Sequence, residues 1–137
     1  MKDQLVTFET AKLAKEKGFK IKTMPFYRVI EPMSSDVKYF QKKSKAFLVK
    51  YNNQFDSVWS DFSAPTQSLL QKWLREKHKI HAFAHPIEDL NSFLAIVDVM
   101  TPSSFERLYI SDNEYNKFEN ALERSLKEGL KLIKDNK

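Results

Sequence analysis

The chain has 137 residues, with a hydrophobic share of 42% and an aromatic share of 13%, and this composition predicts one packed domain over residues 1–137. It contains no cysteine, which excludes disulfides, thiol catalysis and cysteine-bound metal sites. No apolar run is long enough for a signal-peptide core or a membrane span, so we expect a cytoplasmic protein with no membrane partner.

The net charge of +5 is unevenly distributed along the chain. Residues 1–50 contain twelve Lys and Arg against five Asp and Glu, a balance of +7, whereas the remainder of the chain is slightly acidic. A basic excess of this kind indicates either an acidic partner or a surface that lysines simply keep soluble.

In chain order, the first predicted helix covers residues 8–17. Thr7 is suited to the N-cap, and Gly18 to the left-handed position that follows the last turn. This helix is expected at the surface with solvated lysines. Two segments of β-favouring composition follow, at 20–31 and 46–51, and a polar, lysine-rich connection separates them.

The strongest helical pattern lies in SAPTQSLLQKWLREKHKI, residues 63–80. Ser63 is the predicted N-cap, and Pro65 lies in the first turn, where its missing N–H has no cost. Gln67 and Gln71 are expected to point away from the buried face. That face is defined by residues at helical spacing: Thr66, Leu69, Leu70, Trp73, Leu74 and Lys77.

After this helix the hydrophobic period changes to two. Residues 80–86 and 93–100 predict a hairpin whose second strand is central, because both of its faces are largely apolar. Residues 105–110 predict a short further strand. A capping box over 111–114 then predicts the start of a final helix, which extends to about residue 133. Gly129 within this helix indicates close packing against a neighbouring element.

These elements predict a single α+β domain in the order α-β-β-α-β-β-(β)-α. It would contain an antiparallel sheet of about four or five strands with two or three helices. From Ser63 onward the order is that of double-stranded-RNA-binding domains, although this is an analogy of topology alone. Residues 111–118 are acidic where such a domain would hold phosphate with lysines.

Three stretches also carry a family resemblance: TFETAKLAKEKGF near the start, SAPTQSLLQKWLREKHKI, and residues 119–133 near the end. Together they resemble small phage-type proteins of Bacteroidetes genomes and prophages. The resemblance implies an origin in mobile genetic elements. It implies no activity, and no functional residue follows from it.

Motifs for catalysis or cofactor binding are absent from the sequence. Two glycines exclude a phosphate loop or a dinucleotide fingerprint, so no cofactor is expected. His81 and His85 on one strand would lie about 13 Å apart, too far to bind one ion, so no metal site is expected. Asp98 within a strand is either solvated or paired, and Trp59 is favoured as a loop anchor over a ligand-stacking residue. No catalytic residue is predicted.

Three functions remain open. The leading hypothesis is a non-enzymatic accessory module that binds a protein partner, because many aromatic residues occur without a reactive constellation. A small-molecule binder or enzyme is the least favoured, since it would require a pocket with convergent polar groups. The third is nucleic-acid binding, for which the candidate residues are Lys12, Lys15, Lys42, Lys43 and Lys45.

Overall fold

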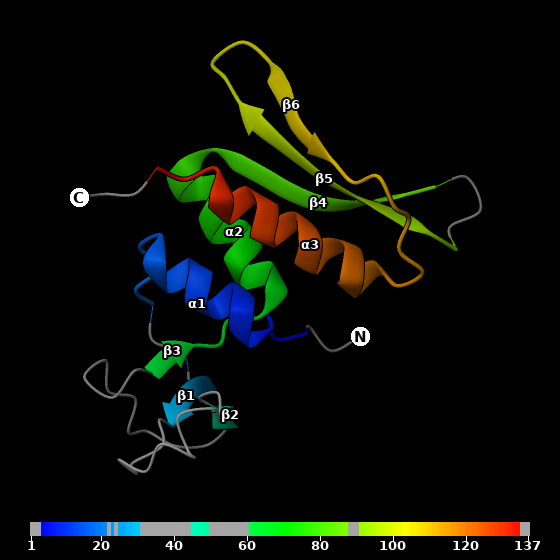
Figure 1. Cartoon of the computed structure of the whole chain (residues 1–137). Helices are drawn as coiled ribbons and strands as arrows, with labels where there is room; N and C mark the ends of the chain where they lie inside the picture. The colour runs from blue at the N-terminus through cyan, green and yellow to red at the C-terminus, as the bar shows by residue number, and fades with distance from the viewer. Residues whose placement is uncertain are drawn as a thin grey trace, which may run out of the picture.

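The computed structural model describes residues 4–21, 23, 25–30, 45–49, 61–87 and 91–134. These residues form three helices and six strands (Figure 1). The α+β class is confirmed, and the order of elements matches with β3 as one additional strand. The elements are α1 (Phe8–Glu16), β1 (Phe26–Ile30), β2 (Lys45–Val49), β3 (Asp61–Ser63), α2 (Gln67–His78), β4 (Ile80–Pro86), β5 (Phe93–Met100), β6 (Phe105–Ile110) and α3 (Phe118–Lys131).

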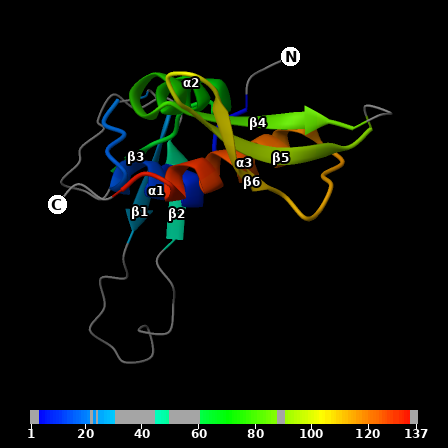
Figure 2. The ribbon, with the colours of Figure 1, turned by 90° about the horizontal axis from the view of Figure 1, so that it is seen from above.

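The strands form two antiparallel sheets, where the sequence analysis expected one. β1 lies between β2 and β3 in one sheet, and β5 lies between β4 and β6 in the other, which we call the β4–β6 sheet. The β4–β6 sheet is the upper layer in Figure 1, and α2 and α3 lie beneath it. Seen from above, β4 and β5 lie over α3, and α2 lies beside β4 (Figure 2). Hydrophobic period identifies a strand but not its neighbour, so the division into two sheets was not predictable.

The core lies between the helices and the β4–β6 sheet. Leu74 of α2 and Leu126 of α3 are fully buried there, together with Ala82 of β4. Tyr27 of β1 and Phe62 beside α1 pack against the same core. One continuous core therefore joins both sheets, and the described residues form a single-domain arrangement.

Helix α1 begins and ends where the sequence analysis predicted, to within one residue. The Thr7 side chain accepts a hydrogen bond from the Thr10 backbone N–H, and Gly18 has a φ of +101°. Lys12 and Lys15 are exposed as expected, whereas Lys17, just after the helix, is half-buried and its Nζ donates to the Ile133 carbonyl oxygen at 2.8 Å. Ala14 is fully buried, so one face of α1 is part of the core.

Helix α2 buries Leu70, Trp73 and Leu74 as predicted, but Lys77 is exposed and the helix begins later than expected. Thr66 is the N-cap, since its hydroxyl oxygen accepts a hydrogen bond from the Leu69 backbone N–H at 3.2 Å. Ser63, the predicted cap, instead belongs to β3 and pairs with Phe26 of β1. Sheet pairing thus determined which of two suitable residues caps the helix.

The prediction that Gln67 and Gln71 point outward is wrong. Gln67 is only 1% exposed, because it lies one turn before the buried Leu70 and its Nε2 donates to the Glu119 carbonyl oxygen of α3, and Gln71 is half-buried against β4.

Helix α3 does not use the predicted capping box. It begins at Phe118, and its N-cap is Lys117, which makes no side-chain cap hydrogen bond. Ser111 is instead held by β5, because its hydroxyl oxygen accepts a hydrogen bond from the Ala95 backbone N–H at 3.0 Å. The predicted close packing at Gly129 is confirmed: a Cβ at this position would lie 3.2 Å from Cγ2 of Ile80.

The β4–β5 hairpin and the central position of β5 are both confirmed. β5 pairs with β4 in continuous register, and Ala82 lies opposite Val97 on the side that faces the helices. The pairing of β5 with β6 is irregular, because the register shifts between Val97 and Asp98 and leaves Leu108 without an opposite residue. Such a bulge bends the strand that carries it. None of the helices in the described ranges has the length and apolar character that crossing a membrane would require.

Candidate functional site

The five lysines proposed for nucleic-acid binding belong to different parts of the chain. Lys12 and Lys15 are exposed on α1, where the Lys15 ammonium lies 4.6 Å from the centre of the Phe62 ring. Lys45 is the first residue of β2, and Lys42 and Lys43 lie outside the described residues. That the five lysines form one binding surface stays a prediction.

The histidines lie near aromatic rings. His81 and His85 flank Phe83 on one face of β4, and the His81 ring is stacked on Phe83 with a centre-to-centre distance of 4.8 Å. The pKa of His78 and that of His81 are lowered, chiefly because burial disfavours the charged imidazolium. Within the part of the chain that the structure describes, no three His, Asp or Glu side chains are grouped to bind a metal ion.

Asp98 is paired and does not face open solvent. Its Oδ1 lies 3.0 Å from Arg107 Nε, and only 13% of the Asp98 side chain is exposed. The hydrogen bond from Arg107, with the charge of the carboxylate, raises the pKa of Arg107. Asp98 thus ties β5 to β6, and its charge is neutralised within the sheet.

The most extensive polar cluster joins the three helices. Glu123 Oε2 accepts hydrogen bonds from the Thr7 backbone N–H and from the hydroxyl groups of Thr7 and Thr10, while Oε1 accepts one from Gln67 Nε2 at 3.1 Å. Burial, followed by the nearby charge of Glu123, raises the pKa of Tyr27. Because its donors come from α1 and α2, Glu123 fixes these helices to α3. Gln67 and Glu123 are 56 residues apart, so no local pattern could have paired them.

A surface pocket lies where α2 leads into β4 and β5 leads into β6. Its volume is about 360 Å³, and its lining consists of Lys79, Met100, Thr101 and Pro102. Lys79 is the only charged side chain in this lining. The pocket therefore lacks the convergent polar groups that a small-molecule site or an enzyme needs.

The two edges of the β4–β6 sheet have different surroundings. Along β4, α2 lies against the strand, and Gln71 Nε2 donates a hydrogen bond to the Ala82 carbonyl oxygen at 2.7 Å. Along the outer side of β6, none of the described residues forms a further strand. β6 is therefore the open edge of the sheet, where backbone N–H and C=O groups can pair with another chain.

The side chains of β6 make this edge apolar. Phe105 is 67% exposed, Leu108 45% and Ile110 49%. Tyr109 is half-buried against the core, and Arg124 of α3 forms a hydrogen bond with its side chain. We call residues Phe105–Ile110 and their unpaired backbone groups the β6 edge; Figure 1 shows it in yellow, at the margin of the upper layer.

Comparisons with protein-family models, with curated proteins and with solved structures find no match to this chain. The kinship with phage-type proteins therefore stays a prediction.

The sequence analysis predicted residues 105–110 as a strand but did not identify its open edge. One signal was available, since Glu106 and Arg107 stand in the middle of an otherwise β-favouring segment, and charged residues are common on edge strands. That signal could not show which side of the strand lacks a neighbour, because strand order is a property of the folded sheet.

Proposed function

We propose that this protein is a non-enzymatic interaction module that binds a protein partner at the β6 edge. The observation that carries the proposal is the combination of an unpaired strand edge with the exposed side chains of Phe105, Leu108 and Ile110. Large apolar side chains grouped on a surface mark interaction sites. An extended segment of the partner would add to β6, with backbone hydrogen bonds providing affinity and side-chain contacts providing specificity.

Two features make the β6 edge selective. Leu108 has no opposite residue on β5, so β6 is bulged at its centre, and Glu106 places an exposed carboxylate beside the bulge. Bulges and charged side chains limit indiscriminate pairing between strand edges. These features favour a specific partner over general aggregation.

The proposal is tested by placing a photo-crosslinking residue at Phe105 and identifying the proteins captured in an extract of the source cells. The captured protein is then purified, and its affinity is measured for the wild type and for the variant Phe105→Ser/Ile110→Ser. We expect the variant to bind at least about tenfold more weakly, which corresponds to about 1.4 kcal/mol.

The matched control is Leu132→Ser, which removes an exposed apolar side chain (40% exposed) outside the β6 edge. This variant should bind as well as the wild type. Equal affinity of the wild type and Phe105→Ser/Ile110→Ser would overturn the proposal. So would capture of RNA or DNA in place of a protein, with binding lost when Lys12 and Lys15 are replaced.

A further inference from the structure

We infer that the partner segment at the β6 edge is a basic strand, in which Lys or Arg alternates with large apolar residues. This inference rests on the proposed function and deepens it, because it gives the partner a chemical class. It follows from the carboxylates on and beside β6, which form no salt bridge with other described residues.

Three free carboxylates lie on β6 and the segment that follows it. From Phe105 to Glu114 the charged residues are Glu106, Arg107, Asp112 and Glu114. Arg107 is bound to Asp98, whereas the other three are exposed and take part in no salt bridge between described residues. With Arg107 neutralised by Asp98, the three carboxylates and the exposed Lys117 before α3 leave a net charge of −2 along this margin of the sheet.

The register of β6 separates its apolar and acidic groups by face. Phe105 and Arg107 lie opposite Met100 and Asp98, so both point to the outer face of the sheet, while Glu106 lies opposite Val99 and points to the other face. Val99 packs against the core, which identifies that second face as the helix side. A strand beside β6 would therefore meet apolar side chains on its outer face and a carboxylate on its helix-facing side.

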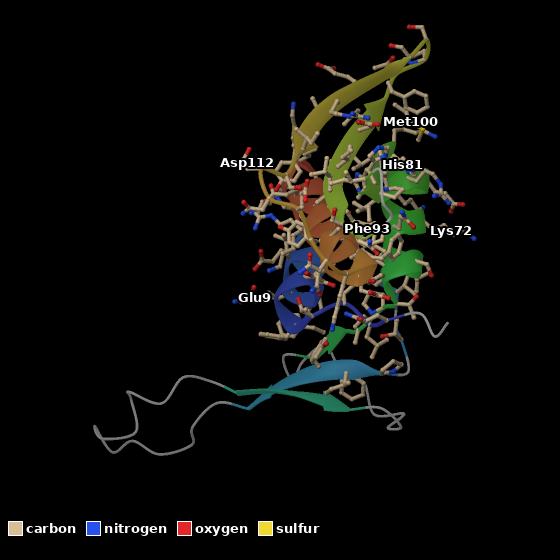
Figure 3. The ribbon with its side chains drawn as sticks, turned by 90° about the vertical axis from the view of Figure 1, so that its right-hand side faces the viewer. Glu9, Lys72, His81, Phe93, Met100 and Asp112 are labelled. Carbon is tan, nitrogen blue, oxygen red and sulfur yellow. The ribbon has the colours of Figure 1, made fainter. Side chains whose placement is uncertain are left out.

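Cross-strand neighbours on one face lie about 5 Å apart, so opposite charges attract there and like charges repel. A partner strand with period two can place apolar residues beside Phe105 and Ile110, and cations beside Glu106. Figure 3 labels Asp112 at the β6 side of the molecule and Lys72 at the opposite side. The negative margin thus continues past the end of β6, where a longer basic segment would follow it.

The same charges disfavour two other occupants. A second copy of this chain would bring an identical excess of negative charge to the shared edge, and like charges across an interface oppose association. Nucleic acid would bring phosphate groups to the same carboxylates. A basic strand of another protein is the occupant that satisfies both the apolar and the acidic groups.

The inference is tested with three labelled synthetic peptides of equal length. The first alternates Lys with Val or Ile, the second alternates Glu with the same apolar residues, and the third is a scrambled form of the first. Fluorescence anisotropy should show that the alternating basic peptide binds at least tenfold more tightly than either of the others. Its affinity should fall as salt is raised, because the carboxylates are exposed.

A charge-reversed variant, Glu106→Lys/Asp112→Lys, should lose the preference for the basic peptide and bind the acidic one instead. The matched control, Glu16→Lys/Glu76→Lys, changes two exposed carboxylates on α1 and α2 by the same amount and should behave as the wild type. Circular dichroism checks that both variants fold.

Equal binding of the basic and acidic peptides, or no binding of the basic peptide at millimolar concentration, overturns the inference about charge. That failure is distinguishable from failure of the proposed function, which is read from the loss of the captured partner in Phe105→Ser/Ile110→Ser. A captured protein whose binding is weakened by Phe105→Ser/Ile110→Ser but unaffected by Glu106→Lys/Asp112→Lys would support binding at the β6 edge. The same result would reject a basic strand as the occupant.

Discussion

β4 and β6 are the two edge strands of the same three-stranded sheet, but β4 is covered by a helix and β6 is exposed. α2 lies beside β4, and Gln71 satisfies a carbonyl oxygen on its outer edge, whereas β6 has no neighbour beyond β5 among the described elements. Ala82 in β4 is fully buried, while Phe105 in β6 is 67% exposed. The composition of the two strands agrees with this contrast, since FERLYI contains the charged residues Glu106 and Arg107, which are rarely buried, whereas IHAFAHP contains no Asp, Glu, Lys or Arg. The positions of the helices decide which strand is covered.

The largest expected effect comes from comparing a buried residue with one on the open edge. Leu126→Ala should lower the free energy of unfolding by about 2–5 kcal/mol, because Leu126 is fully buried and its truncation leaves a cavity. Ile110→Ala, on β6, should cost less than about 1 kcal/mol, since half of the side chain already contacts water. Urea denaturation measures both. Similar losses for the two variants would mean that another surface covers β6.

A smaller effect is expected when the covered edge is opened. Gln71→Ala should lower the free energy of unfolding by about 1 kcal/mol, because it removes the hydrogen bond that satisfies the Ala82 carbonyl oxygen. Lys72→Ala is the control, since the neighbouring side chain is exposed on the same helix. If thermal denaturation gives the same result for both variants, Gln71 does not stabilise the β4 edge.

The smallest expected effect is the pH dependence of stability that arises from His81, on the outer face of the β4–β6 sheet. Burial, assisted by the charge of Arg75, lowers the pKa of His81 below its ordinary value of 6.5, against an opposing effect of Asp98. The unfolded chain therefore binds a proton more readily than the folded one at this position. The contribution of neutral His81 to the free energy of unfolding is fully present above about pH 6.5, and it is lost as the pH falls through the lowered pKa.

Comparing the wild type with His81→Asn between pH 7.5 and pH 5 isolates this contribution, because the carboxylates titrate in both proteins. The wild type should lose more stability than His81→Asn over this range. Parallel losses in urea denaturation would show that burial of His81 has no effect on its proton affinity.

Much of the fold was predictable because its signals are local. Thr7 and Gly18 delimit α1 through capping and left-handed backbone geometry, and the change of period at Ile80 marks the β4–β5 hairpin. The predicted helix starts were wrong where a residue suited to capping a helix was instead engaged by a strand. Ser63 and Ser111 have the chemistry of helix caps, but sheet hydrogen bonds engage both of them, so α2 and α3 begin several residues later.

The candidate site was predictable only in part. The sequence identified a strand at residues 105–110 but left open whether Asp98 is solvated or paired, and the structure shows that it is paired with Arg107. The two partners are on different strands in a bulged register, and this register follows from the folded sheet rather than from the spacing of the residues.

By itself, the sequence determined the α+β class, the order of the elements and the apolar part of the buried helix faces, because each depends on contacts within a few residues. Only the tertiary structure decided that the strands divide into two sheets, that Glu123 joins three helices, and that β6 is the open edge. These features depend on residues far apart in the chain, whose contacts are set by how the helices and sheets pack.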